Sequence, residues 1–272
     1  MTPWYKAPRK YLLVGGFVLA SLALAQAGIG IAPPRYELLL KRGGTANGQF
    51  TLFSRTAEDQ RISVSKVDWL LKPDGALFSL PAGSVPFSAA AWISVATDPF
   101  VLTSGQPVDT RFSLELPQND PLEGSYWTAV AFTTEPKPGG VSGLAAKFQT
   151  RLLAVVYVTV QGTEQPATEL QGVTVVADKD SGKRYLVADV ANTGNVYLRL
   201  NGELRFVNTA GEVAQRLELP ERVLLREGLV RYRLALPEDL PDDVILAQIE
   251  IQPQGPAGSY GGPPLYGEVP LR

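Results

Sequence analysis

Residues Lys147–Val160, KFQTRLLAVVYVTV, decide the fold of this 272-residue chain. Apolar side chains recur at every second position, which is the period of a β-strand with one buried face. They are Phe148, Leu152, Ala154, Val156, Val158 and Val160, and Thr150 interrupts them. One continuous strand of this length would extend about 46 Å, whereas strands usually contain about five or six residues. We expect its excess edge to be available for pairing with another protein.

The same apolar face has a second interpretation, in which the strand lines the core of its own domain. This interpretation applies above all to Leu152–Val160, because a β-sandwich core requires such strands. The preceding part is where a loop and a strand edge would be open to pairing. We therefore take Leu144, Phe148 and Leu152 as candidate positions of a strand-addition edge, although Ala146 and Thr150 break the alternation.

The rest of the chain has the same two-residue period, which predicts an all-β protein without amphipathic helices. Its 22 prolines and 26 glycines divide it into short segments. Hairpin turns are predicted at Pro73–Gly75, Asp180–Gly182 and Asn208–Gly211, where glycine adopts positive φ at little cost. The period changes within residues 62–71, since Ile62 and Val64 share one parity while Val67, Trp69 and Leu71 share the other. A β-bulge near Lys66 would reconcile the two sets.

A polar segment, Gln161–Thr168 (QGTEQPAT), divides the strand-forming segments into two sets. We expect two tandem immunoglobulin-like β-sandwich domains, residues 28–160 and 169–272, joined by a linker at 161–168. The second domain ends in a segment rich in glycine and proline. The residues that follow it, Leu265–Leu271, either return as a short edge strand or extend away from the domain.

The amino-terminal segment has the features of a secretory signal peptide, residues 1–27. Lys6, Arg9 and Lys10 precede an apolar run, Tyr11–Ala25, which ends in the small residues that signal peptidase accepts. The run has about fifteen residues, whereas a membrane span needs about twenty, so cleavage is favoured over a retained anchor. We expect an exported protein of the periplasm or cell envelope, with no membrane span after cleavage.

Composition argues against several functions. Removing the signal takes away three of the 25 basic residues and none of the 27 acidic ones, which leaves a net charge of −5. The remaining basic residues are scattered, so no nucleic-acid partner is predicted. The chain has no histidine and no cysteine. The usual catalytic base, zinc ligand, thiol nucleophile and disulfide are therefore missing, and we predict a protein that is not an enzyme and that has neither a metal nor a cofactor.

Five segments resemble, in order, the first domain of the PapD-like periplasmic pilus-assembly chaperones. They are IAPPRYEL, QFTLFSRT, AWISVATDPFVLTSGQPVDTRFSLELP, GSYWTAVAFTTEP and QTRLLAVVYV, within residues 29–160. The segment NTGNVYLRLNGELRFVNTAGEV, in the second half, is similar to the companion domain of these proteins. The resemblance implies two immunoglobulin-like domains and a chaperone-like protein that binds subunits of a pilus or other surface structure by β-strand addition. It also implies an outer-membrane assembly protein as a further partner.

In that family, two basic residues anchor the carboxylate at the carboxyl terminus of the bound subunit. By position, the resemblance implies Arg35 and Arg151 for this role. Guanidinium groups suit it, since each donates two parallel hydrogen bonds to a carboxylate. The family typically has lysine at the position of Arg151, and both arginines are equally compatible with ordinary exposed strand positions. The alternative function is a structural or adhesive scaffold of the cell envelope without chaperone activity.

Overall fold

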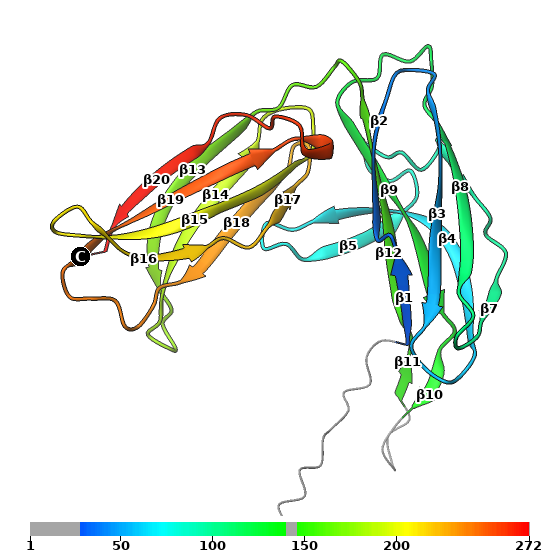
Figure 1. Ribbon diagram of the computed structural model, residues 1–272, viewed down its shortest axis with the longest axis horizontal. Helices are drawn as coiled ribbons and strands as arrows, with labels where there is room; N and C mark the ends of the chain where they lie inside the picture. Colours follow the sequence, from blue (N-terminus) through cyan, green and yellow to red (C-terminus); the bar gives the residue numbers. More distant parts are fainter. Residues whose placement is uncertain (1–27, 140–145, 272) are drawn as a thin grey trace, which may run out of the picture.

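The computed structural model describes residues 28–139 and 146–271, which form two β-sandwiches, one from each half of the chain (Figure 1). This confirms the predicted all-β fold with two tandem immunoglobulin-like sandwiches. Within the described ranges, the one helical element is a 3-10 turn, Pro256–Gly258. No helix in these ranges is long and apolar enough to cross a membrane. The predicted signal segment lies outside the described residues.

The first sandwich packs a four-stranded sheet, in the order β1-β3-β8-β6, against a six-stranded sheet. The second sheet has the order β2-β12-β9-β4-β5, and β7 also pairs with β4. The strands are β1 (Ile29–Ala32), β2 (Arg35–Leu40), β3 (Thr45–Ser54), β4 (Gln60–Leu71), β5 (Leu77–Pro81), β6 (Ile93–Val95), β7 (Phe100–Leu102), β8 (Val108–Glu115), β9 (Ser125–Thr134) and β12 (Arg151–Val160). A separate pair, β10 (Lys137–Gly139) and β11 (Ala146–Phe148), forms a two-stranded sheet.

Aromatic rings from both sheets fill the first core. The rings of Phe50 and Phe112 stack with centroids 5.2 Å apart, and Tyr36 meets each of them edge-on. Phe132 packs against Phe50 from the opposite sheet. From β12, Ala154, Val156, Val158 and Val160 are buried in the same core. The core-lining interpretation of this strand is therefore confirmed.

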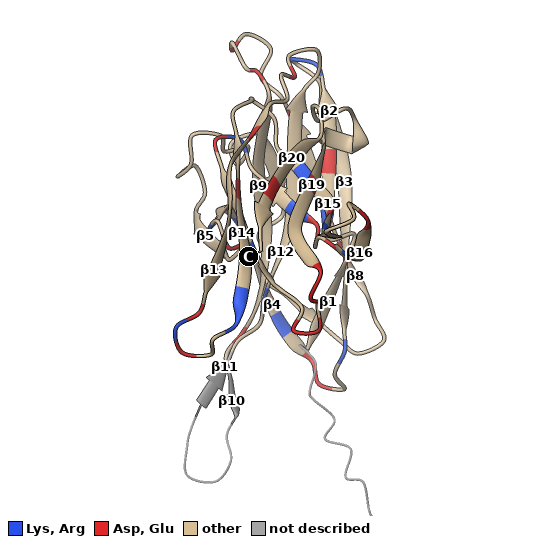
Figure 2. Ribbon diagram, turned by 90° about the vertical axis from the view of Figure 1, so that its left-hand side faces the viewer, with Lys and Arg blue, Asp and Glu red and all other residues tan. Residues whose placement is uncertain are grey.

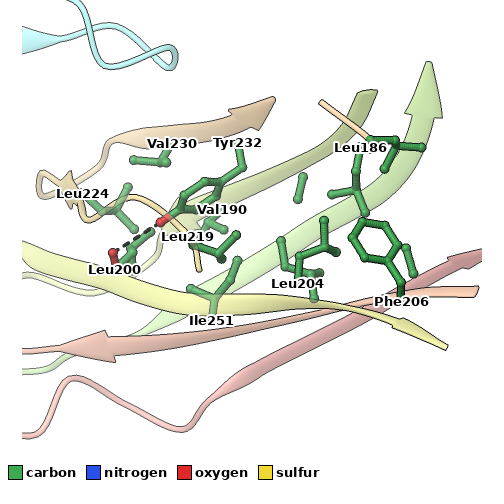
Figure 3. Packing of buried hydrophobic residues seen from close by; sticks show 14 of the residues in the cluster. Leu186, Val190, Leu200, Leu204, Phe206, Leu219, Leu224, Val230, Tyr232 and Ile251 are labelled. Carbon is green, nitrogen blue, oxygen red and sulfur yellow. Dashed lines mark hydrogen bonds between the residues drawn. The ribbon is translucent and has the colours of Figure 1, made fainter. Parts of the chain in front are cut away.

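The second sandwich packs a three-stranded sheet, β13-β14-β18, against a five-stranded one, β16-β15-β19-β20, in which β17 also pairs with β15. The strands are β13 (Thr168–Ala177), β14 (Arg184–Asn192), β15 (Leu198–Asn208), β16 (Val213–Glu218), β17 (Arg222–Leu224), β18 (Leu229–Ala235), β19 (Val244–Gln254) and β20 (Leu265–Pro270). Figure 3 shows Leu204, Phe206 and Ile251 packed between the sheets, and Tyr232 donating a hydrogen bond to the carbonyl of Leu200 (3.3 Å). β20 pairs with β19, so the end of the chain returns as an edge strand.

The prediction of one continuous strand at Lys147–Val160 is wrong, because Gln149 and Thr150 separate β11 from β12. Thr134 accepts two hydrogen bonds that involve side chains here, next to one backbone bond from its own N–H to the Thr150 carbonyl (2.9 Å). The Thr150 N–H donates to the side-chain oxygen of Thr134 (2.9 Å), and the Gln149 side-chain amide donates to the Thr134 carbonyl (2.9 Å). Since polar side chains that bond to nearby backbone compete with strand pairing, the strand is interrupted at this point.

The predicted bulge near Lys66 is also wrong. β4 pairs with β9 in one unbroken register from Ile62 to Val67. The change of parity has another cause, since Ile62 and Val64 face the first core, whereas Val67 and Trp69 belong to a buried cluster on the opposite face. The second domain covers that outer face. β4 is therefore buried on one face at Ile62 and Val64, and on both faces from Val67 onward.

The three predicted hairpin turns are confirmed. Pro73–Gly75 connects β4 to β5, Asp180–Gly182 connects β13 to β14, and Asn208–Gly211 connects β15 to β16. The first of these turns also extends to the second domain (Figure 1), where the carbonyl of Pro73 accepts a hydrogen bond from the Arg231 N–H (2.7 Å). Because Arg231 lies on β18, an edge strand, the hairpin covers part of that edge.

Aromatic packing joins the two sandwiches. The rings of Tyr157 on β12 and Tyr197 of the second domain stack with centroids 4.2 Å apart, and Trp69 meets Tyr157 edge-on. Nearby, the guanidinium group of Arg226 lies 4.1 Å from the centre of the Phe87 ring. Tyr157, Tyr197 and Trp69 are each at most 4% exposed. Burial of this apolar surface therefore fixes the second domain against the outer face of the six-stranded sheet.

The loop that follows β5 depends on a buried carboxylate. Asp68 is 0% exposed and accepts hydrogen bonds from the backbone N–H of Ser84 (2.7 Å) and Val85 (3.2 Å) and from the Ser88 hydroxyl (2.7 Å). We expect Asp68→Ala to lower the free energy of unfolding by about 3 kcal/mol, because buried donors lose their acceptor. Urea unfolding followed by tryptophan fluorescence measures this loss. Asp109→Ala, which removes one exposed hydrogen bond to Thr51, is the control; an equal loss in the two variants would contradict the role of Asp68.

Stability should fall at alkaline pH because of the tyrosines between the domains. Burial raises the pKa of Tyr157 and of Tyr197. Above a pH of about 10, the unfolded chain releases the protons of these two hydroxyl groups, whereas the folded protein retains them. In this range, each tyrosine therefore lowers the free energy of unfolding by about 1.4 kcal/mol for each unit by which the pH rises. Replacing both residues by phenylalanine should reduce the pH dependence of the urea midpoint between pH values of about 9 and 11. Tyr260→Phe, at an exposed position, is the control. An unchanged pH dependence in the double variant would contradict this account.

Candidate functional site

Strand β12 has a neighbour on only one side over its first four residues. It pairs with β9 from Arg151 to Thr159, but with β2 only from Val155 to Val160. No strand of the described chain covers the other side of Arg151–Ala154, and we call this side the open edge. The Val155 N–H donates toward β2, to the carbonyl of Pro34 (3.1 Å). By alternation, the backbone N–H and C=O groups of Arg151 and Leu153 face the open edge.

The path of the preceding chain explains why this edge is open. β1 pairs with β3 in the opposite sheet, and after Pro33 and Pro34 the chain joins β12 in parallel from Arg35 onward. β1 therefore lies beside the start of β12 without pairing with it (Figure 1). Ile31 and Leu152, one from each strand, are half-buried and pack against the first core. An added strand would cover apolar side chains that are only partly covered here.

The three residues predicted for strand addition do not lie on one strand. Leu144 falls outside the described residues. Phe148 lies on β11, where its backbone pairs with Lys137, and Leu152 lies on β12, where its backbone pairs with Phe132. The Leu152 side chain points toward its own core. Of the three, Leu152 lies directly at the open edge.

The structure brings Arg35 and Arg151 to the same face of the six-stranded sheet. Arg35 lies opposite Val155 in the register, and Val155 shares its face with Arg151. Four residues of β12 separate the two levels, or about 13 Å. The Arg151 guanidinium donates a hydrogen bond of 3.3 Å to the Ser79 hydroxyl, and among the described residues it makes no ion pair. Both side chains are exposed, and the Leu153 side chain lies between them on the same face of the sheet.

Arg35 is connected to a charged network that the sequence analysis missed. Its Nε lies 3.0 Å from Oε1 of Glu37. The same oxygen accepts hydrogen bonds from Nη2 (2.6 Å) and Nε (3.1 Å) of Arg199, which belongs to the second domain. Arg199 also pairs with Glu221 (2.8 Å). A pair separated by 162 positions leaves no local pattern in the sequence, so periodicity and motif spacing give no signal for it.

Burial and charge act in opposite directions on Glu37. Burial alone would raise the pKa of its carboxyl, but the hydrogen bonds and the charge of Arg199 outweigh burial and lower this pKa below its usual value. The Glu37 carboxyl is thus ionised at neutral pH. The Arg199 side chain is only 10% exposed, whereas the Arg35 side chain is 51% exposed. Of the two arginines in this network, Arg35 is consequently the one that an anionic ligand can reach.

The site presents three kinds of group that can contact a peptide strand. It offers backbone donors and acceptors at a strand edge, half-buried apolar side chains on one face and two guanidinium groups on the other. In the described part of the chain, no group of three acidic, histidine or cysteine residues could hold a metal ion. Figure 2, in which the second domain faces the viewer, shows acidic and basic residues interspersed over strands and loops.

No protein-family model matches this chain, and no curated protein sequence matches it significantly. Solved structures do match. A chain from the chaperone–tip adhesin complex of CFA/I fimbriae biogenesis is 13% identical, with a TM-score of 0.43 over 90% of this chain and 100% of that chain. A chain from the CsuC–CsuE chaperone–tip adhesion subunit pre-assembly complex of Acinetobacter baumannii Csu pili is 13% identical, with a TM-score of 0.46 over 88% and 98%.

A third match is a chain from the Salmonella enterica SafA pilin–SafB chaperone complex, which is 10% identical, with a TM-score of 0.42 over 89% of this chain and 96% of that chain. Fimbrial chaperones are also the class of protein that the sequence resembles. The three matches have identities between 10% and 13% and TM-scores below 0.5.

Proposed function

We propose that this chain is an exported, non-enzymatic, chaperone-like protein that binds subunits of a pilus or another surface structure by β-strand addition. The observation that carries the proposal is the open edge of β12 at Arg151–Ala154, beside the half-buried side chains of Ile31 and Leu152. In strand addition, main-chain hydrogen bonds supply affinity, and alternate side-chain positions supply specificity. Both components are available at this edge.

The size of the open edge sets the expected strength of binding. It presents the N–H and C=O groups of Arg151 and Leu153, and each hydrogen bond contributes about 0.5–1.5 kcal/mol net. Covering Ile31 and Leu152 adds about 25 cal/mol for each Å² of apolar surface removed from water. Since these contributions are modest, a further contact is needed for tight binding. A charged anchor at one end of the added strand meets this need.

Arg35 and Arg151 are the proposed anchor for the terminal carboxylate of a bound subunit. Two features support this role: both side chains are exposed on one face of the sheet, and the Arg151 guanidinium makes only one weak hydrogen bond to the described residues. A guanidinium group binds a carboxylate through two parallel hydrogen bonds. The strand would then extend along the open edge toward Phe148 and Leu144.

The domain organisation and the location belong to the same proposal. Residues 28–160 form the client-binding domain, and residues 161–168 link it to a supporting domain, residues 169–272. Export to the periplasm or cell envelope rests on the signal-like residues 1–27. An outer-membrane assembly protein is proposed as a second partner, because subunits held at the open edge must be passed on to a growing structure.

Leu153→Pro tests strand addition at the open edge. Proline has no N–H, and the Leu153 N–H faces the open edge, so the substitution removes a donor for a client strand while the pairing with β9 is kept. The intact protein, crosslinked mildly in its native envelope, should recover small surface-fibre subunits, and mass spectrometry should map the crosslinks to residues 144–153. We expect Leu153→Pro and the Arg35→Ala/Arg151→Ala variant each to lower this recovery at least about five-fold, because each client hydrogen bond or ion pair contributes about 1 kcal/mol.

Leu77→Pro on the outer edge of β5 is the matched control. The Lys72 N–H donates to the carbonyl of Ala76, so the Leu77 N–H faces away from β4 by alternation. Circular dichroism and urea unfolding establish that each variant is folded. Equal recovery from the intact protein and from folded Leu153→Pro would contradict the proposal. Recovery of only this chain or of wall components, unchanged by the substitutions, would favour an envelope scaffold.

A further inference from the structure

One oxygen atom, Oε1 of Glu37, lies between the proposed anchor and the second domain. Three nitrogen atoms lie within 3.1 Å of it: Nε of Arg35 and both Nε and Nη2 of Arg199. The closest of them, at 2.6 Å, is Nη2 of Arg199. Arg35 and Arg199 therefore share one carboxylate, and the buried arginine of the second domain holds it more closely.

This sharing determines how strongly Arg35 attracts a further anion. A carboxylate that pairs fully with Arg35 would satisfy its guanidinium group and would also repel an incoming carboxylate. Arg199 neutralises more of the Glu37 charge than Arg35 does, because it makes two contacts with Oε1, one of them at 2.6 Å, whereas Arg35 makes one at 3.0 Å, and because its side chain is less exposed to water. Partly buried pairs are also screened less by salt than exposed pairs. The positive charge of Arg35 is thus left available to a ligand.

We propose that Arg199 of the second domain is a positioning residue for the ligand anchor: by holding Glu37, it keeps Arg35 available for the carboxylate of a bound subunit. This inference rests on the proposed anchoring function of Arg35. It gives the second domain a direct part in binding, although that domain contributes no residue to the open edge.

The coupling operates in both directions. A ligand carboxylate on Arg35 draws this arginine away from Glu37, which leaves Oε1 entirely to Arg199. The ion pair between the domains then becomes stronger when ligand is bound. Thermodynamic linkage requires the two effects to be equal, so whatever strengthens the pair between Glu37 and Arg199 also strengthens binding of the carboxylate.

The ratio of two dissociation constants tests this coupling. The probe is a short synthetic peptide of alternating valine and serine, prepared with a free carboxyl terminus and as the terminal amide. The amide constant divided by the acid constant gives the carboxylate gain, measured by isothermal titration calorimetry. We expect Glu37→Gln to raise this gain and Arg199→Gln to lower it, each about two- to five-fold, as for pairs of partly exposed charges. In the double variant, the gain should equal that of Glu37→Gln alone, because Arg199 acts through Glu37.

Further variants separate this coupling from changes in net charge and from misfolding. Asp189→Asn and Arg216→Gln remove one charge each from exposed ion pairs elsewhere on the second domain, so they should leave the gain unchanged. Arg199→Lys should restore part of the gain lost in Arg199→Gln. If Arg199→Gln does not fold, Glu221→Gln takes its place: it frees Arg199 from its second, half-exposed carboxylate and should raise the gain.

The outcomes distinguish the inference from the function on which it rests. If the acid peptide does not bind, or if Arg35→Gln leaves the gain unchanged, the proposed anchor is wrong, and the coupling with it. If Arg35→Gln abolishes the gain but Glu37→Gln and Arg199→Gln leave it unchanged, the anchor stands and the coupling is overturned. An equal effect of Arg199→Gln with and without Glu37 would also overturn it, since it would mean that Arg199 acts on the ligand directly.

Discussion

The beginning of this domain pairs with one sheet and then with the other, and it cannot pair with both at the same level. β1 completes the edge of the four-stranded sheet, and β2 completes the edge of the six-stranded sheet only after the chain has passed Pro33 and Pro34. The start of β12 is therefore left with one neighbour. Backbone groups at such an edge normally need protection from unwanted pairing. Here the open edge lies between two half-buried apolar residues and an exposed arginine, an arrangement suited to a specific partner.

The six-stranded sheet is exceptional in this molecule because both of its faces are covered in its central part. Its inner face packs on the first core, and its outer face packs on Tyr197 and Leu225 of the second domain. Arg35 and Arg151 lie on this same outer face, beyond the aromatic cluster. The packing between the domains and the proposed ligand anchor thus share one surface. A change in the way the domains pack would alter the contact between Arg199 and Glu37, which shares β2 with Arg35.

Much of the fold could be predicted from the sequence because it depends on local patterns. Alternation identified the strands, and turn residues such as Asp74 and Gly75 identified the hairpins. The interruption at Gln149 and Thr150 could not be predicted in this way, since it depends on the side chain of Thr134, a residue of another strand. Val67 and Trp69 suggested a bulge because alternation does not reveal that a second domain covers the outer face. The sequence resemblance led to Arg35 and Arg151, but not to Glu37 and Arg199, whose contact exists only once the two domains are packed.

The aromatic surface between the domains has a consequence for biogenesis. Chains are made from the amino terminus, so the first sandwich can fold before the second has emerged. Trp69 and Tyr157, which are buried in the complete protein, then lie on a surface that still lacks its cover. During this interval the nascent chain exposes an apolar patch, which can associate with other chains, together with its open strand edge. Rapid arrival of the second domain protects the patch and leaves the strand edge as the exposed feature of the finished protein.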